Sequence, residues 1–231
     1  MNFVDRIDAG RRLAKKLEAY AGRNDIFVLG IPRGGVPVAF QVADELGAPL
    51  DVFVVRKLGV PSHEELAFGA IATGGMRVLD SQIVEEVGIP DQEIERIAAK
   101  ERQELNRRER VYRGGRLPLN LAGKTVILVD DGIATGASTL AAITALRELK
   151  PARIVLAAPV APASTCRRLR REVDDLVCLH TPETFFAIGQ FYEDFSQVSD
   201  EEVTSLLQLN ADQRAYEATA ARANNRKGAY P

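Results

Sequence analysis

The feature that most constrains the fold of this chain is an unbroken apolar run, Val126–Val129, followed by two aspartates and a loop of small and hydroxyl-bearing residues. Such runs are typical of strands that are covered on both faces, as in parallel sheets. Beyond the loop, apolar residues recur at helical spacing until Pro151: Leu140, Ile143, Leu146 and Leu149. The pattern predicts a buried parallel strand, a loop at its carboxyl end and a crossover helix.

Four more apolar runs have the length of strands, and the segments between them are long enough for helices. With the first run, they predict five core strands: Ile26–Leu29, Val52–Val55, Val126–Val129, Ile154–Ala158 and Leu176–Leu179. A helix is expected before them, over Asp5–Ala21. Strands that alternate with helices favour a central parallel sheet with right-handed crossovers and helices on both faces. The predicted fold class is therefore α/β and Rossmann-like.

Extra material lies between the second and third predicted strands. A hairpin over Phe68–Leu79, a short helix and a long charged helix from Asp91 to about Arg113 form an insertion of about residues 68–116. We expect this insertion to stand beside the main sheet, within one domain of residues 1–209. From residue 210 the composition shifts to Ala, Asn, Gln and charged residues without apolar periodicity, which predicts a disordered tail over residues 210–231.

Composition and charge limit the function classes. The 231 residues are 46% hydrophobic and 27% charged with a formal net charge of −2, which argues against a dominant nucleic-acid or membrane surface. The N-terminus lacks the apolar core of a signal peptide, and neither the two cysteines nor the two histidines, His63 and His180, have the spacing of a metal site. We expect a cytoplasmic protein with no membrane or nucleic-acid partner.

The loop after the first apolar run has the chemistry of a sugar-phosphate site. The segment Thr135–Thr139 offers backbone N–H groups and hydroxyls at a helix N-terminus, where the helix dipole favours an anion. Asp130 and Asp131 are ionised acceptors that match the donor hydroxyls of a ribose ring. Alternatively, Thr135 or Ser138 only caps the helix and the acids are turn residues, but that interpretation leaves the paired acids unexplained.

The sequence VILVDDGIATGAST resembles the phosphoribosyl pyrophosphate (PRPP) motif of type I phosphoribosyltransferases. The resemblance extends over roughly residues 3–207 and implies the type I phosphoribosyltransferase fold. It also implies that PRPP is bound by the residues of this motif: Asp130, Asp131, Gly132, Ala134, Thr135, Gly136, Ala137, Ser138 and Thr139.

A second loop, Gly30–Gly35, follows the first predicted strand. Its glycines let the backbone approach a ligand closely and Arg33 adds a fixed cation, so the loop favours anion binding. The spacing is not that of a dinucleotide fingerprint. Taken alone, the loop could be only a tight connection. The family resemblance implies that Arg33, Gly34 and Gly35 form the pyrophosphate loop.

A third loop begins with Arg56 and Lys57, directly after the second predicted strand. Adjacent cations followed by Gly, Pro and Ser favour charge neutralisation and a movable flap over Lys57–Leu66, and the alternative is a solvated turn. Several type I enzymes, adenine phosphoribosyltransferases among them, carry an Arg-Lys pair here, which implies that both cations bind pyrophosphate. Glu64 or Glu65 could exchange a proton with the base.

The resemblance implies a reaction in which a nitrogen acceptor, expected to be a nucleobase, displaces pyrophosphate from PRPP. The expected catalytic residues are Asp130, Asp131, Lys57 and Glu64, and the expected cofactor is Mg²⁺ carried by PRPP rather than held directly by the protein. A role in nucleobase salvage and nucleotide metabolism follows. We expect small-molecule partners, PRPP and a nitrogen base, with a homodimer as the candidate assembly.

The acceptor base is not defined by the sequence. Ala134 stands where hypoxanthine-guanine enzymes usually place an aspartate, so the loop is more similar to that of adenine enzymes. A hood over about residues 181–199 concentrates aromatic residues, of which Phe185, Phe191 and Tyr192 are the candidate base contacts. The alternative is that these rings pack against the core.

Two other functions remain open from the sequence. A non-catalytic PRPP-sensing regulator could bind nucleic acid or protein through the arginine-rich segment Arg102–Arg116, although a solvated helix face also explains that segment. A hydrolase with Asp130 as nucleophile is disfavoured because the usual D-x-D pattern is missing.

Overall fold

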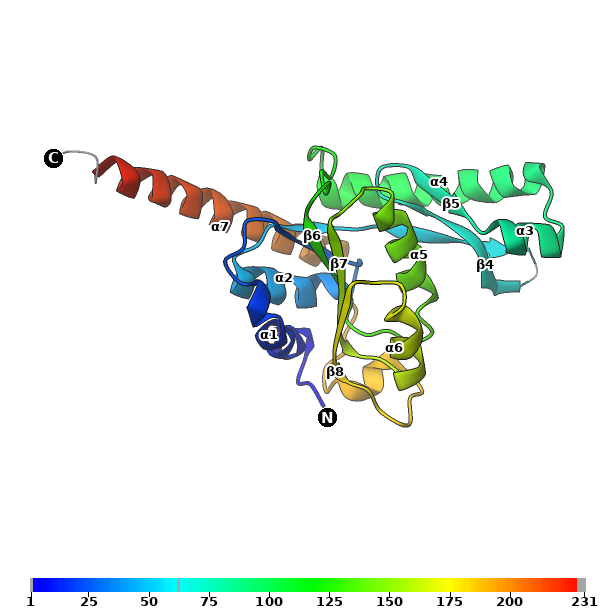
Figure 1. Cartoon of the computed structure of the whole chain (residues 1–231), viewed down its shortest axis with the longest axis horizontal. Coiled ribbons are helices and arrows are strands. Elements are labelled where there is room, and N and C mark those ends of the chain that lie inside the picture. Colours follow the sequence, from blue (N-terminus) through cyan, green and yellow to red (C-terminus); the bar gives the residue numbers. More distant parts are fainter. Residues whose placement is uncertain (1, 62, 228–231) are drawn as a thin grey trace.

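The computed structural model describes residues 2–61 and 63–227, apart from the side chains of residues 63–65 and 220–227. Its centre is a parallel sheet of five strands in the order β2-β1-β6-β7-β8 (Figure 1). These strands are Leu50–Val52 (β2), Ile26–Gly30 (β1), Thr125–Val129 (β6), Arg153–Val160 (β7) and Asp175–His180 (β8). The predicted central parallel sheet is confirmed, and the strand of the first apolar run, β6, is its middle strand.

Helices cover both faces of this sheet. The helices α1 (Arg6–Lys16) and α2 (Gly35–Leu46) lie on one side, and α5 (Ala137–Arg147) and α6 (Ala163–Leu169) lie on the other (Figure 1). All five residues of β6 are buried, and the four apolar ones, Val126–Val129, alternate between the two layers. Ile127 packs with the core of α1 and α2, whereas Leu128 packs with the core of α5 and α6. Burial on both faces explains why the run is apolar without interruption.

The first predicted helix is shorter than expected. Asp5 caps α1 by accepting a hydrogen bond from the backbone N–H of Asp8. The helix ends at Lys16, and a separate short 3₁₀ turn, η1 (Glu18–Tyr20), completes the segment.

A second, antiparallel sheet has three strands, β3 (Val55–Val60), β4 (His63–Ala72) and β5 (Met76–Leu79), so the inserted segment extends back to Val55. The helices α3 (Ser81–Val87) and α4 (Asp91–Arg113) follow, and α4 runs alongside this sheet, away from the main one (Figure 1). The buried stripe of α4 has helical spacing: Ile94, Ala98, Leu105 and Tyr112. The predicted hairpin, short helix and long helix are all present.

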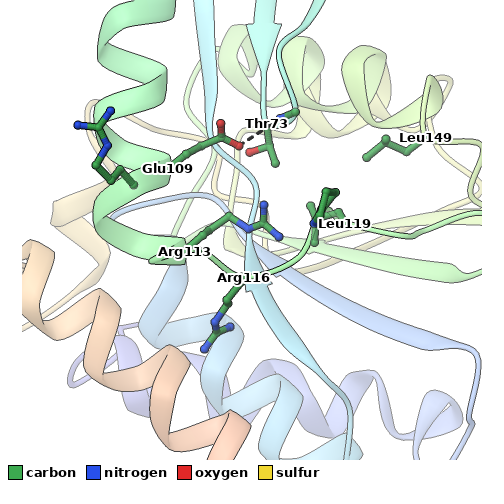
Figure 2. Close-up of a pocket in the computed structure, with 10 residues that line it drawn as sticks. Thr73, Glu109, Arg113, Arg116, Leu119 and Leu149 are labelled. Carbon is green, nitrogen blue, oxygen red and sulfur yellow. Dashed lines mark hydrogen bonds between the residues drawn. The ribbon is translucent and has the colours of Figure 1, made fainter.

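Side chains near the end of α4 hold the insertion against the rest of the domain. Arg113 pairs with the buried Asp51 of β2 at 3.2 Å, and Arg116 donates to the carbonyl oxygen of Leu207 at 2.8 Å. Within the insertion, Glu109 accepts a hydrogen bond from the backbone N–H of Gly74 at 3.1 Å. Figure 2 shows these side chains around a cavity of about 430 Å³. Two of its arginines are thus engaged in structural contacts.

The prediction of one strand over Val52–Val55 was wrong. β2 ends at Val52, and β3 begins at Val55 in the other sheet. The chain crosses between the sheets at Phe53 and Val54, where the N–H of Phe53 donates to Gly30 at 3.0 Å and the N–H of Val54 donates to the Thr73 hydroxyl at 2.9 Å. Both sheets bury this segment, so the apolar run continues although the strand does not.

The structure also differs from the prediction of a disordered tail over residues 210–231. Helix α7 runs from Asp200 to Lys227 and therefore includes most of the segment predicted to be disordered. The Asn210 amide is buried, where it accepts from the N–H of Leu50 at 2.9 Å and donates to the carbonyl of Ala48 at 3.3 Å. Arg214 donates to the carbonyl oxygen of Gly47. Polar side chains, rather than an apolar stripe, fix this part of the helix.

Candidate functional site

Two of the predicted ligand loops meet at the carboxyl edge of the main sheet. β1 and β6 are in register, with Gly30 opposite Val129, so the loops that follow leave from the same point. A Cβ atom added to Gly34 would lie 1.9 Å from Oδ2 of Asp131, and one added to Gly35 would lie 2.9 Å from Cα of Asp130. Only glycine permits this approach. The structure therefore brings the predicted pyrophosphate loop into contact with the predicted ribose acids.

The two acids are held in a low-dielectric environment. Asp131 is 7% exposed, and Oδ1 of Asp130 accepts the N–H of Asp131 at 3.0 Å. Burial, and next the negative charge of Asp131, raise the pKa of Asp130 well above its ordinary value. Burial also raises the pKa of Asp131, although the neighbouring Arg6 guanidinium opposes that shift. The acids form an electrostatically coupled pair.

Arg6 is a site residue that the sequence analysis missed. It lies in the first turn of α1, and its Nε donates to Oδ2 of Asp131 at 2.8 Å. Its Nη1 donates to the carbonyl oxygen of Ser196 at 2.8 Å, and its guanidinium lies 4.0 Å from the centroid of the Phe195 ring. Arg6 thus joins α1, the hood and the acid pair. Nothing in the local sequence distinguishes it from the other arginines of this helix.

The hood residues lie next to Asp131, but two of the three predicted base contacts are packed into the protein. Phe191 and Tyr192 are 6% and 7% exposed, and Phe3 packs with both in one apolar cluster. The Tyr192 hydroxyl donates to the backbone carbonyl of Asp131 at 2.5 Å. Phe185 is only partly buried, with its ring centroid 5.4 Å from that of Phe191. Phe191 and Tyr192 therefore pack against the core, as the alternative interpretation of the hood expects. Their burial conflicts with direct contact to a base.

Two side chains of α6 form hydrogen bonds to the backbone of the predicted phosphate loop. Thr165 donates its hydroxyl to the carbonyl of Ala134 at 2.8 Å, and Arg168 donates to the carbonyl of Thr135. Gly136 precedes α5 with φ of 75°, a left-handed conformation that favours glycine. α5 begins at Ala137, and the N–H groups of its first turn have no partners within the helix.

The other loop residues complete this arrangement. Gly132 lies against the hood, because an added Cβ would be 2.4 Å from Cγ2 of Ile188. Ser138 is exposed, whereas Thr139 is buried, with 2% of its surface exposed.

The predicted cations occupy two different positions. Arg33 lies beside the acid pair, where a cavity of about 330 Å³ is lined by Arg6, Arg33, Gly34, Asp131 and Phe195. One Nη atom of Arg33 is 3.8 Å from a carboxylate oxygen of Asp200, at the start of α7.

Arg56 and Lys57 belong to β3 and do not follow a strand end, contrary to the prediction. Arg56 pairs with Glu101 of α4 at 2.6 Å, and Lys57 lines a cavity that Ser138 also lines. The predicted flap over Lys57–Leu66 is mainly the β3–β4 hairpin rather than a loop. The side chain of Glu64 lies outside the described residues, as does that of Glu65.

Two negative findings complete the description. Among the described residues, no group of three or more His, Cys, Asp or Glu side chains is placed to hold a metal ion. None of the helices in the described part of the chain is long and apolar enough to cross a membrane.

The fold and the paired loops define a phosphoribosyl transferase domain. Residues 3–196 match the family of that description, and the chain belongs to it. The chain is 48% identical over 205 residues to "Putative phosphoribosyl transferase Rv0571c" of Mycobacterium tuberculosis, a match that covers 89% of this chain and 46% of the relative. The chain therefore spans about half the length of this curated relative.

Two further proteins are similar to this chain. The crystal structure of the protein TT1426 from Thermus thermophilus superposes with a TM-score of 0.82 at 43% identity, covering 90% of this chain and 98% of that one. The chain is also 35% identical over 130 residues to "Bifunctional protein PyrR" of Chloroflexus aurantiacus, covering 55% of this chain and 65% of the relative.

Proposed function

We propose that this domain transfers the 5-phosphoribosyl group of PRPP to a nitrogen acceptor of the nucleobase class and releases pyrophosphate. The contact between Gly34 and Asp131 carries the proposal, because it joins a loop suited to the diphosphate with acids suited to the ribose diol. Family membership supports PRPP-dependent transfer in general. The assignment of the acceptor to the nucleobase class goes beyond what family membership supports.

Each loop would have a separate task in this reaction. The carboxylates of Asp130 and Asp131 would accept hydrogen bonds from the ribose hydroxyls and stabilise positive charge that develops on the ring. The first turn of α5, with Thr135 and Ser138, would hold the 5-phosphate. Arg33 and the amides of its loop would stabilise the departing pyrophosphate. Since the chemistry needs positioning and charge stabilisation, no side-chain nucleophile is required.

The arrangement of the site fits a Mg²⁺ ion that is bound to PRPP. Two adjacent carboxylates are a suitable donor set for a Mg²⁺ ion that the diphosphate of PRPP carries, and the bound ion would neutralise charge on the leaving group. The Arg6–Asp131 ion pair places a cation at the same carboxylate. Arg6 would therefore hold Asp131 in position until the ribose hydroxyls bind.

The proposal is tested by incubating the protein with Mg²⁺ and PRPP against a panel of purines, pyrimidines and other nitrogen bases, and measuring pyrophosphate. Release that depends on one base and disappears in Asp131→Asn supports the transferase. Binding of PRPP in calorimetry without base-dependent release would instead support the PRPP-sensing regulator. That alternative agrees with the burial of Phe191 and Tyr192 in the hood. Phosphate release without any acceptor would indicate a hydrolase.

A further inference from the structure

A cavity of about 500 Å³ lies where the insertion meets the proposed phosphate loop. β3 contributes Arg56 and Lys57 to its lining, and the first turn of α5 contributes Ser138. The remaining polar wall comes from α4, through Arg96, Lys100 and Glu101. Residues from the insertion and from the phosphate loop therefore face the same space.

One side of α4 is directed at this cavity. Arg96, Ile97, Lys100 and Glu101 are spaced so that they share one helical face, while Ile94 and Ala98 are buried in the hydrophobic core. The ion pair between Arg56 and Glu101 at 2.6 Å ties this face to β3. The helix is thus fixed in place by packing and by a charge pair at the cavity wall.

The cavity carries an excess of positive charge. Among the described side chains, four cations and one carboxylate line it. The carboxylate, Glu101, is paired with Arg56, and Lys57 also has an interaction partner. Arg96 is bound to Glu93 of its own helix at 2.7 and 2.8 Å. Among the side chains that the structure describes, Lys100 has neither an ion-pair nor a hydrogen-bond partner. Cations concentrated around a concave surface attract anions strongly.

The geometry points to Lys100, with Arg96 beside it, as a phosphate-binding side chain that the insertion adds to the PRPP site. The inference rests on the proposed function and gives α4 a part in it. Ser138 offers a hydroxyl and lies at a helix N-terminus, where anions are favoured, and Lys100 lines the same cavity and carries an ammonium group. The ligand chemistry is a phosphate or diphosphate group, and either end of PRPP carries one.

Calorimetry on the full chain with Mg²⁺ tests this assignment, using PRPP, ribose 5-phosphate and inorganic pyrophosphate as separate ligands. The variants are Lys100→Gln, Lys100→Arg and the matched control Arg102→Gln, which removes one positive charge from α4 outside the cavity. Lys100→Gln should weaken PRPP binding about tenfold, as expected for a lost charge-assisted hydrogen bond, while the other two variants should stay within about twofold of the original protein.

The simpler ligands identify which group Lys100 contacts. Weaker binding of pyrophosphate alone places the contact at the diphosphate, and weaker binding of ribose 5-phosphate alone places it at the 5-phosphate. Lys100→Gln that behaves as Arg102→Gln with all three ligands would overturn the inference. If the original protein binds pyrophosphate through Lys100 but shows no PRPP-dependent turnover, the anion site stands and the proposed transfer fails. If it binds none of the three ligands, both fail.

Discussion

Arg6 and Asp131 lie 125 residues apart in the chain and form a buried ion pair with Nε 2.8 Å from Oδ2, each side chain being 11% exposed. The pair connects the first turn of α1 to the carboxyl end of β6. Tyr192 holds the same segment through the backbone carbonyl of Asp131. The acid is therefore fixed from both the N-terminal helix and the hood, which suits a group that must meet a ribose ring in one orientation.

We expect Arg6→Gln to destabilise the protein by about 3 kcal/mol at pH 7.5, since a buried carboxylate loses its partner. The pKa of Asp131 is raised by burial and held down by Arg6, so the substitution should raise it further. The cost should therefore shrink as the pH falls and Asp131 is protonated. Urea denaturation at pH 7.5 and pH 4.5 measures both effects. Arg12→Gln breaks the exposed pair with Asp8, a 3.5 Å hydrogen bond to the carbonyl of Asn2 and a contact with the Phe3 ring, none of which leaves a buried charge unpaired, and should change stability far less. An equal loss in both variants would contradict the role given to Arg6.

Replacing Gly34 with alanine should abolish PRPP binding, because the new methyl group would lie 1.9 Å from Oδ2 of Asp131. We expect a stability loss of about 2 kcal/mol from this overlap. The double variant Gly34→Ala, Asp131→Ala removes the obstructing carboxylate. The glycine substitution should therefore cost less in that background, with a coupling energy of about 1 kcal/mol or more. Independent, additive effects in the denaturation cycle would show that the two residues do not touch.

The sequence was sufficient for the parts of the site that follow directly from strands. Val126–Val129 is apolar because both faces are covered, and that run located Asp130 and Asp131 at the sheet edge. Arg6 could not be found this way, since its role depends on a contact across 125 positions. The break after Val52 was missed for a related reason. An apolar run indicates that its residues are buried, but it does not show whether one sheet or two sheets cover them.

Asp130→Asn should remove activity and stabilise the protein at neutral pH. The pKa of Asp130 is raised well above its ordinary value in the folded state, by burial first and by Asp131 next. Its contribution to folding is present below the ordinary pKa and lost as the pH rises through the raised pKa. Asparagine does not titrate, so the variant should be more stable than the original protein at pH 7.5, and this difference should disappear near pH 3.

Asp44→Asn is the matched control for this substitution, because it removes the same charge from the exposed surface of α2. Its unfolding free energy should follow that of the original protein across the pH range. If Asp130→Asn is less stable than the original protein at pH 7.5, Asp130 is stabilised in its charged form and the stated electrostatics are wrong.

Asn210→Ala tests whether the start of the segment predicted to be disordered is part of the folded domain. Its side chain satisfies the N–H of Leu50 in β2 at 2.9 Å, so alanine would leave a buried donor without an acceptor, at a cost of about 2 kcal/mol. Gln208→Ala changes an exposed residue of the same helix, bonded only to Asp212, and should cost much less. Urea denaturation compares the two variants, and hydrogen exchange reports protection of the Leu50 amide. Equal stability of both variants, with rapid exchange at Leu50, would mean that the helix does not dock on β2 in solution.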